Sequence, residues 1–154
     1  MRVIGVGNVL LCDEGVGVHV VRELSRRGEP PGTEFLDGGV AGATLLNLIE
    51  GEERVVLIDA ADAPLPPGTV VRLLADDLSS GGAPRWSLHD LNLAGVLGMM
   101  RLRETLPELL VLGIVPADIG TYSLDLSAQL SRRFEEILGK VREEIASFAI
   151  SPRG

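Results

Sequence analysis

The sequence predicts an α/β fold in three layers, in which a mostly parallel, twisted sheet of about five strands carries helices on both faces. Short apolar runs alternate along the chain with longer segments whose apolar residues recur at helical spacing. Such alternation favours a parallel sheet covered on both sides. One connection between consecutive strands is too short to hold a helix, so one strand is expected to be antiparallel to its neighbour.

Five segments have the length and composition of buried strands. They are residues 2–6, 33–36, 54–58, 69–74 and 109–115. The third reads R-V-V-L-I and is expected to be the central strand, ending at Asp59. A proline-rich turn at 64–68 precedes the fourth strand and is the connection too short for a helical crossover. Residues 76–86 are expected to form a loop.

Four segments are predicted to be helical. They run from Asp13 or Glu14 to about Arg27, from 43 to 49, from 88 to 104, and from 127 to 148. Ser127 is expected to cap the last helix, because a serine oxygen can accept a hydrogen bond from a free backbone N–H in the first turn.

Composition narrows the function. The 154 residues fit a single domain, 1–154, and 45% of them are hydrophobic. The net charge of −8 argues against nucleic acid or an anionic membrane as partner. A single cysteine excludes an internal disulfide, and we find neither a signal peptide nor a segment able to cross a bilayer. We therefore expect a monomeric cytoplasmic protein.

Carboxylates follow three of the predicted strands. Asp13 and Glu14 come after the first strand, Asp37 after the second and Asp59 after the third. The carboxyl ends of parallel strands meet at one edge, where ligands bind, so Glu14, Asp37 and Asp59 are expected to meet there. Residues 28–53 contain no Lys or Arg to neutralise them. Clustered carboxylates without basic partners favour a bound cation.

His89 is the candidate for a third kind of ligand. Ser87 and Asp90 form a capping box around it, which places His89 in the first turn of the predicted helix. Two carboxylates and an imidazole suit a divalent transition metal such as nickel, iron or zinc. The alternative is structural, because acids at helix starts and strand ends often only stabilise those ends.

Other chemistries find less support. Gly5 and Gly7 resemble the start of a dinucleotide fingerprint, but the third glycine position holds Leu10. Cys12 lies beside two acids that oppose a thiolate. No serine-hydrolase elbow and no H-E-x-x-H helix occur. We assign structural roles to His19 and Trp86.

Taken together, the motifs resemble those of the hydrogenase maturation proteases. The resemblance covers nearly the whole chain and rests on five motifs that occur in the expected order. They are Val3–Gly17 (VIGVGNVLLCDEGVG), Asp37–Gly39 (DGG), Leu57–Ala60 (LIDA), Ser87–Asp90 (SLHD), and Gly113–Pro116 (GIVP) with Leu126–Ser127.

The resemblance implies an endopeptidase that removes the C-terminal extension of a nickel–iron hydrogenase large-subunit precursor after nickel insertion. It assigns Glu14, Asp59 and His89 as ligands of a nickel that the substrate supplies, and Glu14 or Asp59 as a general base. The acid at Asp37, with Gly38 and Gly39, is implied to contact the substrate. Cys12 departs from the family, in which glycine is common at this position.

Two rival functions remain open at this stage. A peptidyl-tRNA hydrolase shares a G-x-G-N strand end, matched here by Gly5–Asn8, but needs a basic groove that this acidic chain does not predict. A non-catalytic nickel chaperone or docking module would use the same three ligands as the protease. Metal binding without cleavage of any precursor would favour the chaperone.

Overall fold

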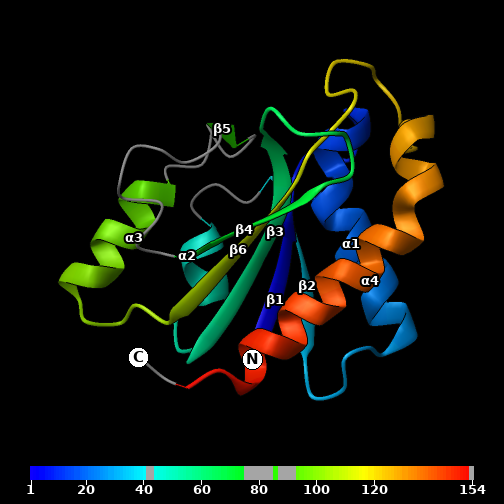
Figure 1. Cartoon of the computed structure of the whole chain (residues 1–154). Coiled ribbons are helices and arrows are strands. Elements are labelled where there is room, and N and C mark those ends of the chain that lie inside the picture. The colour runs from blue at the N-terminus through cyan, green and yellow to red at the C-terminus, as the bar shows by residue number, and fades with distance from the viewer. Residues whose placement is uncertain (41–43, 75–84, 87–92, 153–154) are drawn as a thin grey trace.

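The computed structural model describes residues 1–40, 44–74, 85–86 and 93–152, and in these ranges it contains one sheet (Figure 1). Five strands lie side by side in the order β2-β1-β3-β6-β4, and a short sixth strand, β5, pairs with β3. The strands are β1 (Arg2–Val6), β2 (Glu34–Gly39), β3 (Arg54–Asp62), β4 (Val70–Leu74), β5 (Arg85–Trp86) and β6 (Glu108–Ile114).

Helices cover both faces of the sheet, as the sequence predicts. Figure 1 shows one pair of helices on each side, α1 with α4 and α2 with α3. Their bounds are α1 (Val16–Arg27), α2 (Thr44–Ile49), α3 (Leu93–Leu102) and α4 (Ala128–Ile150). A single 3₁₀ turn, η1 (Cys12–Gly15), precedes α1. The three-layer α/β prediction is therefore confirmed. No helix in the described ranges is long and apolar enough to cross a membrane.

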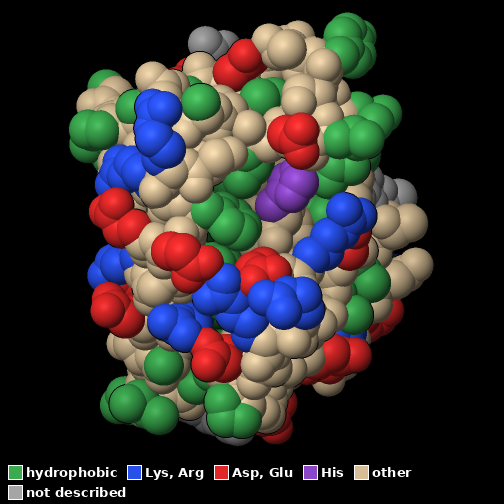
Figure 2. All heavy atoms as spheres, turned by 90° about the vertical axis from the view of Figure 1, so that its right-hand side faces the viewer, with side chains coloured by type: hydrophobic (Ala, Val, Ile, Leu, Met, Phe, Trp, Pro, Cys, Tyr) green, Lys and Arg blue, Asp and Glu red, His purple; other side chains and the backbone are tan. Residues whose placement is uncertain are grey.

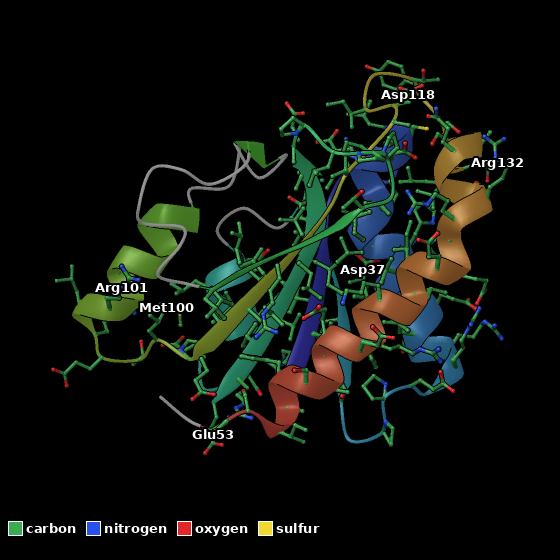
Figure 3. All side chains as sticks on the ribbon, in the orientation of Figure 1. Asp37, Glu53, Met100, Arg101, Asp118 and Arg132 are labelled. Atoms are coloured by element: carbon green, nitrogen blue, oxygen red, sulfur yellow. The ribbon has the colours of Figure 1, made fainter. Side chains whose placement is uncertain are left out.

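Alternation along β3 divides the interior into two cores. Val56 and Ile58 belong to the core under α1 and α4, whereas Val55 and Leu57 belong to the core under α2. Met100 of α3 packs into the second core and is labelled in Figure 3. Successive residues of a strand point to opposite faces, so a residue's position in this alternation tells which face its side chain takes.

The antiparallel strand is confirmed, and its neighbour is β6. β4 pairs antiparallel with β6, whereas β1–β2, β1–β3 and β3–β6 are all parallel. The chain places β6 between β3 and β4, although β4 follows β3 in sequence. The prediction of a loop over 76–86 was wrong at its end, because Arg85 and Trp86 pair with Asp62 and Ala61 of β3.

Both long helices begin in ways that their sequences explain. The predicted helix from Asp13 or Glu14 starts as η1 and becomes α-helical only at Val16. Ser127 caps α4 as expected, since its hydroxyl accepts a hydrogen bond of 3.3 Å from the N–H of Leu130.

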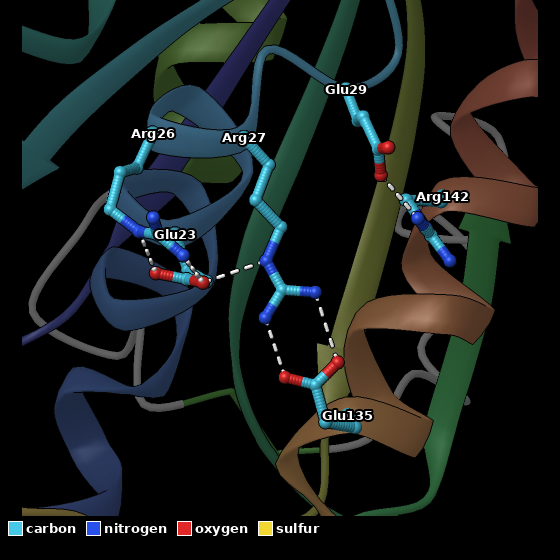
Figure 4. A network of polar contacts seen from close by, with 6 residues as sticks. All are labelled: Glu23, Arg26, Arg27, Glu29, Glu135 and Arg142. Carbon is cyan, nitrogen blue, oxygen red and sulfur yellow. Dashed lines mark hydrogen bonds and ion pairs between the residues drawn. The ribbon is translucent and has the colours of Figure 1, made fainter.

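Ion pairs join α1 to α4 across the surface of their layer (Figure 4). Arg27 donates to Glu23 in its own helix and, through two nitrogens, to Glu135 of α4. Hydrogen bonds from Arg26 and Arg27 lower the pKa of Glu23 to about 2. These groups are exposed, so we expect them to orient the helices more than to stabilise the fold.

Two glycines bring α1 into backbone contact with the sheet. A Cβ at Gly17 would lie 2.2 Å from the carbonyl oxygen of Ile58, and one at Gly5 would lie 2.2 Å from the carbonyl oxygen of Gly17. A carbon atom cannot approach an oxygen to which it is not bonded so closely, so both positions require glycine. The start of α1 is thereby fixed directly over the carboxyl ends of β1 and β3.

A pair of helical glycines tests this contact. Gly17→Ala should destabilise the fold by about 1–3 kcal/mol or more, because rigid backbone must move to admit the methyl group. Gly139→Ala in α4 is the matched control, since nothing lies within 4 Å of the place that its methyl group would take. It should stabilise the fold by about 0.5–1 kcal/mol. Urea unfolding followed by circular dichroism measures both, and equal effects would contradict the contact.

Candidate active site

Glu14 and Asp59 lie on segments that pack together at the carboxyl edge of the sheet. Glu14 is half-buried in η1, which contacts β3. A Cβ at Gly7, whose φ is +136°, would lie 2.0 Å from the carbonyl oxygen of Glu14. Asp59 is fully buried in β3, directly after the Ile58 carbonyl on which α1 rests. The structure therefore places these two acids on neighbouring segments.

Asp37 lies on the other face of the sheet. Asp37 shares its face with Phe35, two residues earlier, and Phe35 packs against the core under α1 and α4. Asp59 shares its face with Leu57, which belongs to the opposite core. The strand register leads to the same result. Gly5 of β1 pairs with both Asp37 and Ile58, so the side chain of Asp37 takes the face of Ile58 and not that of Asp59. Asp37 therefore lies near the carboxyl end of its strand, but its side chain is on the opposite face of the sheet from that of Asp59.

Asp37 also has a basic partner. Arg22 of α1 binds its carboxylate with nitrogen–oxygen distances of 2.6 and 2.9 Å. We expected no neutralising charge because residues 28–53 contain none, but the partner comes from the preceding helix. Figure 3 labels Asp37 beside α1.

Gly38 and Gly39 form an irregular end to β2. The pairing of β1 with β2 shifts by one residue, so Val6 lies opposite Gly39 and Gly38 is the extra residue. A Cβ at Gly38 would lie 2.9 Å from a side-chain carbon of Ile4, so packing explains that glycine. Gly39 has a φ of +52° with open space beside it, and its N–H donates to Asp37.

His89, with Ser87 and Asp90, lies outside the described residues. The nearest described strand before it, β5, pairs with β3 at Ala61 and Asp62. Within the ranges that the structure describes, no group of three His, Cys, Asp or Glu side chains is placed to hold a metal. The predicted ligand set includes His89, so it stays a prediction.

Asp13 also lies at the carboxyl edge of the sheet, and the sequence analysis did not predict its structural role. It is fully buried, and its carboxylate accepts hydrogen bonds from the N–H groups of Ala117, Asp118 and Ser127 at 2.9, 3.0 and 2.7 Å. These donors lie 104 to 114 residues away in sequence, so no local pattern could identify them. Asp13 thereby ties the turn that bears Glu14 to the segment between β6 and α4.

Cys12 is unsuited to act as a nucleophile. Burial raises the pKa of its thiol, and the charge of Asp13 raises it further, so the reactive thiolate is disfavoured. Its backbone has a φ of +52°, a conformation that glycine adopts without strain. Cys12 therefore occupies a position whose backbone conformation favours glycine.

His19 is half-buried in α1, and its Nε2 atom has no hydrogen-bond partner among the described residues. Burial lowers the pKa of His19, and the charge of Arg22 lowers it further. Asp125, Asp13 and Asp37 act in the opposite direction with smaller effect. The fold therefore favours the neutral form of this histidine.

Comparison with known proteins gives consistent matches. A family model described as hydrogenase maturation protease (HycI) matches residues 18–144. The hydrogenase 2 maturation protease of Escherichia coli is 33% identical over 147 residues, which cover 92% of this chain and 90% of that protein. The hydrogenase expression/formation protein HupD of Thiocapsa roseopersicina is 32% identical over 154 residues, covering 98% of this chain and 70% of that protein. The structure of the hydrogenase-maturating endopeptidase HybD from Escherichia coli superimposes with a TM-score of 0.76 at 31% identity, covering 91% of this chain and 88% of that one.

Replacing the buried carboxylate of Asp13 tests its structural role. Asp13→Asn should cost about 1–3 kcal/mol of unfolding free energy, because the amide NH₂ would face a backbone N–H and leave a buried donor unpaired. Asp62→Asn is the control, since Asp62 is exposed at the end of β3 and should change stability by less than about 0.5 kcal/mol. Urea denaturation measures both unfolding free energies, and an unchanged value for Asp13→Asn would refute the structural role of Asp13.

His19 predicts a pH dependence of stability. Its folded-state pKa lies below that of the unfolded chain, so the unfolded state binds the proton more readily. The unfolding free energy should therefore fall as the pH decreases below about 6.5, the ordinary pKa of histidine. His19→Leu should reduce this fall between pH 7 and 5 in thermal unfolding. An unchanged pH profile in the variant would contradict the prediction.

Proposed function

The chain belongs to the hydrogenase maturation protease family, and on that premise we propose that it removes the C-terminal extension of a nickel–iron hydrogenase large-subunit precursor after nickel insertion. It is an endopeptidase, a hydrolase of peptide bonds. Membership of this family also argues against the peptidyl-tRNA hydrolase alternative. The observation that carries the proposed site is the fully buried carboxylate of Asp59, in the strand against which the turn bearing Glu14 packs.

The carboxylate of Asp59 is fully buried in the central strand of the sheet. Removing a carboxylate from water costs several kcal/mol unless hydrogen bonds or opposite charge compensate it, and such groups concentrate at functional sites. Asp59 lies at the carboxyl edge of a largely parallel sheet, where α/β proteins bind their ligands. These features support a catalytic or metal-recognising role for Asp59 better than a purely structural one.

In this proposal the metal belongs to the substrate. Glu14 and Asp59 supply carboxylate oxygens to the nickel of the precursor, and His89 supplies an imidazole nitrogen. Trp86 pairs with Ala61, two residues after Asp59, and His89 follows Trp86 by three residues. His89 belongs to the SLHD motif of residues 87–90, one of the five motifs that resemble those of the family, and this resemblance supports it as the third ligand. Reading the nickel would restrict cleavage to precursors that have received it.

Hydrolysis needs a proton acceptor and a polarised carbonyl. Glu14 or Asp59 takes a proton from a water molecule as its oxygen attacks the scissile carbonyl carbon, and the proton then passes to the departing amine. The alternative is that the nickel polarises that carbonyl and the two carboxylates only hold the metal. In this second route the attacking water gives its proton directly to the departing amine. Both routes use the same residues and differ in whether a carboxylate carries that proton.

Asp37, Gly38 and Gly39 are proposed to contact the substrate chain near the cut. The space that the described residues leave beside Gly39 supports this, because none of them lies where a peptide backbone would approach. The ion pair with Arg22 keeps the Asp37 carboxylate in place, and its second oxygen holds the N–H of Gly39.

The proposed function is tested by cleavage of a purified cognate precursor, nickel-loaded or nickel-free, with the C-terminus of the precursor followed by intact mass spectrometry. We expect one defined tail to be lost, and only from the nickel-loaded form. Cleavage of both forms would refute nickel recognition. Tight nickel-dependent binding with no cleavage would instead favour the chaperone alternative.

Replacement of Glu14 tests its role in the same assay. Glu14→Gln should reduce cleavage at least about 100-fold, because a carboxamide neither takes the proton nor binds nickel as strongly. The fold should persist, since Glu14 is only half-buried. Glu50→Gln makes the same charge change at an exposed position after α2 and should leave the rate unaltered. Full activity of Glu14→Gln would remove Glu14 from the mechanism.

A further inference from the structure

An apolar patch lies next to the turn that bears Glu14. Four large hydrophobic side chains are exposed in the segment before η1 and in the segment between β6 and α4. They are Leu10, Ile119, Tyr122 and Leu124, with exposed fractions of 56%, 46%, 86% and 65%. Figure 2 shows hydrophobic side chains gathered at the upper edge of the face it displays, at the end of the molecule where Figure 1 places the segment between β6 and α4.

Backbone hydrogen bonds join the two segments of the patch. The N–H of Ser123 donates to the carbonyl of Leu10 at 3.0 Å, and the N–H of Cys12 donates to the carbonyl of Ser123 at 3.0 Å. Leu10 is thereby held next to the neighbours of Ser123, which are Tyr122 and Leu124. Leu10, Tyr122 and Leu124 therefore belong to one surface and not to two unrelated loops.

The patch is held firmly in its exposed position. Asp118 accepts hydrogen bonds from the N–H groups of Gly120 and Thr121 and from the Thr121 hydroxyl at 3.0, 2.9 and 2.6 Å. The buried carboxylate of Asp13 holds the start of the segment through Ala117 and its end through Ser127. A segment fixed at so many points keeps its apolar side chains in water, and persistent exposed apolar surface commonly marks an interaction site.

The charges around the patch indicate the kind of partner. Residues 3–21 and 116–131, which supply the patch, contain no Lys or Arg. The first basic residues after these ranges are Arg22, which pairs with Asp37, and Arg132 in the first turns of α4. Asp125 is exposed there, and hydrogen bonds from Thr121 lower the pKa of Asp118, which keeps it ionised. An acidic rim disfavours a second copy of this chain, since a two-fold contact would place the same acids opposite each other.

We propose that the apolar patch docks the folded body of the precursor through an apolar surface flanked by Lys or Arg, separately from the capture of its tail at Glu14 and Asp59. This inference rests on the proposed function. Glu14 lies close by, because its N–H donates to the carbonyl of Leu11 at 3.1 Å within the same turn. A precursor seated on the patch therefore lies directly beside the proposed cleavage site.

The test compares kinetics on the nickel-loaded precursor. The double variant Tyr122→Ser/Leu124→Ser should lower kcat/KM about 10-fold or more, with the loss in KM, because it removes buried apolar contact from the docked complex. Both side chains are exposed, so folding should be preserved. Ile150→Ser is the matched control, since Ile150 is 86% exposed at the opposite end of α4 and should not change KM.

Charge reversal tests the acidic rim independently. Asp125→Lys should raise KM several-fold at low salt, and added salt should reduce the difference from the wild type. Glu143→Lys makes the same change at an exposed position in the second half of α4 and should have no such effect. Sedimentation of the wild type should show a monomer.

The outcomes separate the two proposals. A wild type that cleaves nothing refutes the proposed function, and docking is then judged by direct binding of the precursor to wild type and double variant. Wild-type kcat/KM or wild-type binding in the double variant overturns the docking surface while leaving the protease intact. A dimer that the double variant dissociates would assign the patch to self-association and likewise overturn the proposal.

Discussion

The buried carboxylate of Asp13 is the interaction on which the carboxyl edge of this sheet depends. A buried charge is tolerated only when hydrogen bonds replace the water it has lost, and here backbone N–H groups of Ala117, Asp118 and Ser127 do so. This one side chain, which belongs to the turn η1, thereby connects that turn to the segment after β6 and to Ser127, the N-cap residue of α4. The position of Glu14 therefore depends on the neighbouring acid, whose two carboxylate oxygens bind backbone N–H groups.

The glycines of the first motif contribute to the same edge of the sheet because they have no side chain. Gly5 and Gly17 let α1 touch the backbone of β1 and β3, and Gly7 leaves room for the carbonyl of Glu14. A dinucleotide-binding motif uses similar glycines to admit a pyrophosphate. In this chain the corresponding space beside Gly5 and Gly7 is filled by backbone atoms of Gly17 and Glu14.

Local patterns in the sequence were enough to predict the layers, the central strand and the Ser127 cap, because burial, alternation and capping act over a few residues. They could not predict that β6 separates β3 from β4, since strand order depends on contacts between distant segments. For the same reason, local patterns could not predict that Asp37 and Asp59 lie on opposite faces of the sheet. Asp37 and Asp59 each belong to a strand beside β1, but a register offset of one residue sends their side chains to opposite faces. Arg22 then neutralises Asp37 from a helix that lies outside the acidic stretch of sequence.

The connection between Asp13 and the apolar patch bears on the proposed cleavage of the precursor at one defined place. The patch and the turn that bears Glu14 are parts of one hydrogen-bonded unit, so the separation between docking surface and proposed cleavage site is fixed before the substrate arrives. Little ordering of the protease then opposes binding, which favours affinity. A body held at a fixed distance from the carboxylates can present only a short stretch of its tail to them. Rigid docking and nickel recognition together would restrict both which precursor is cut and where.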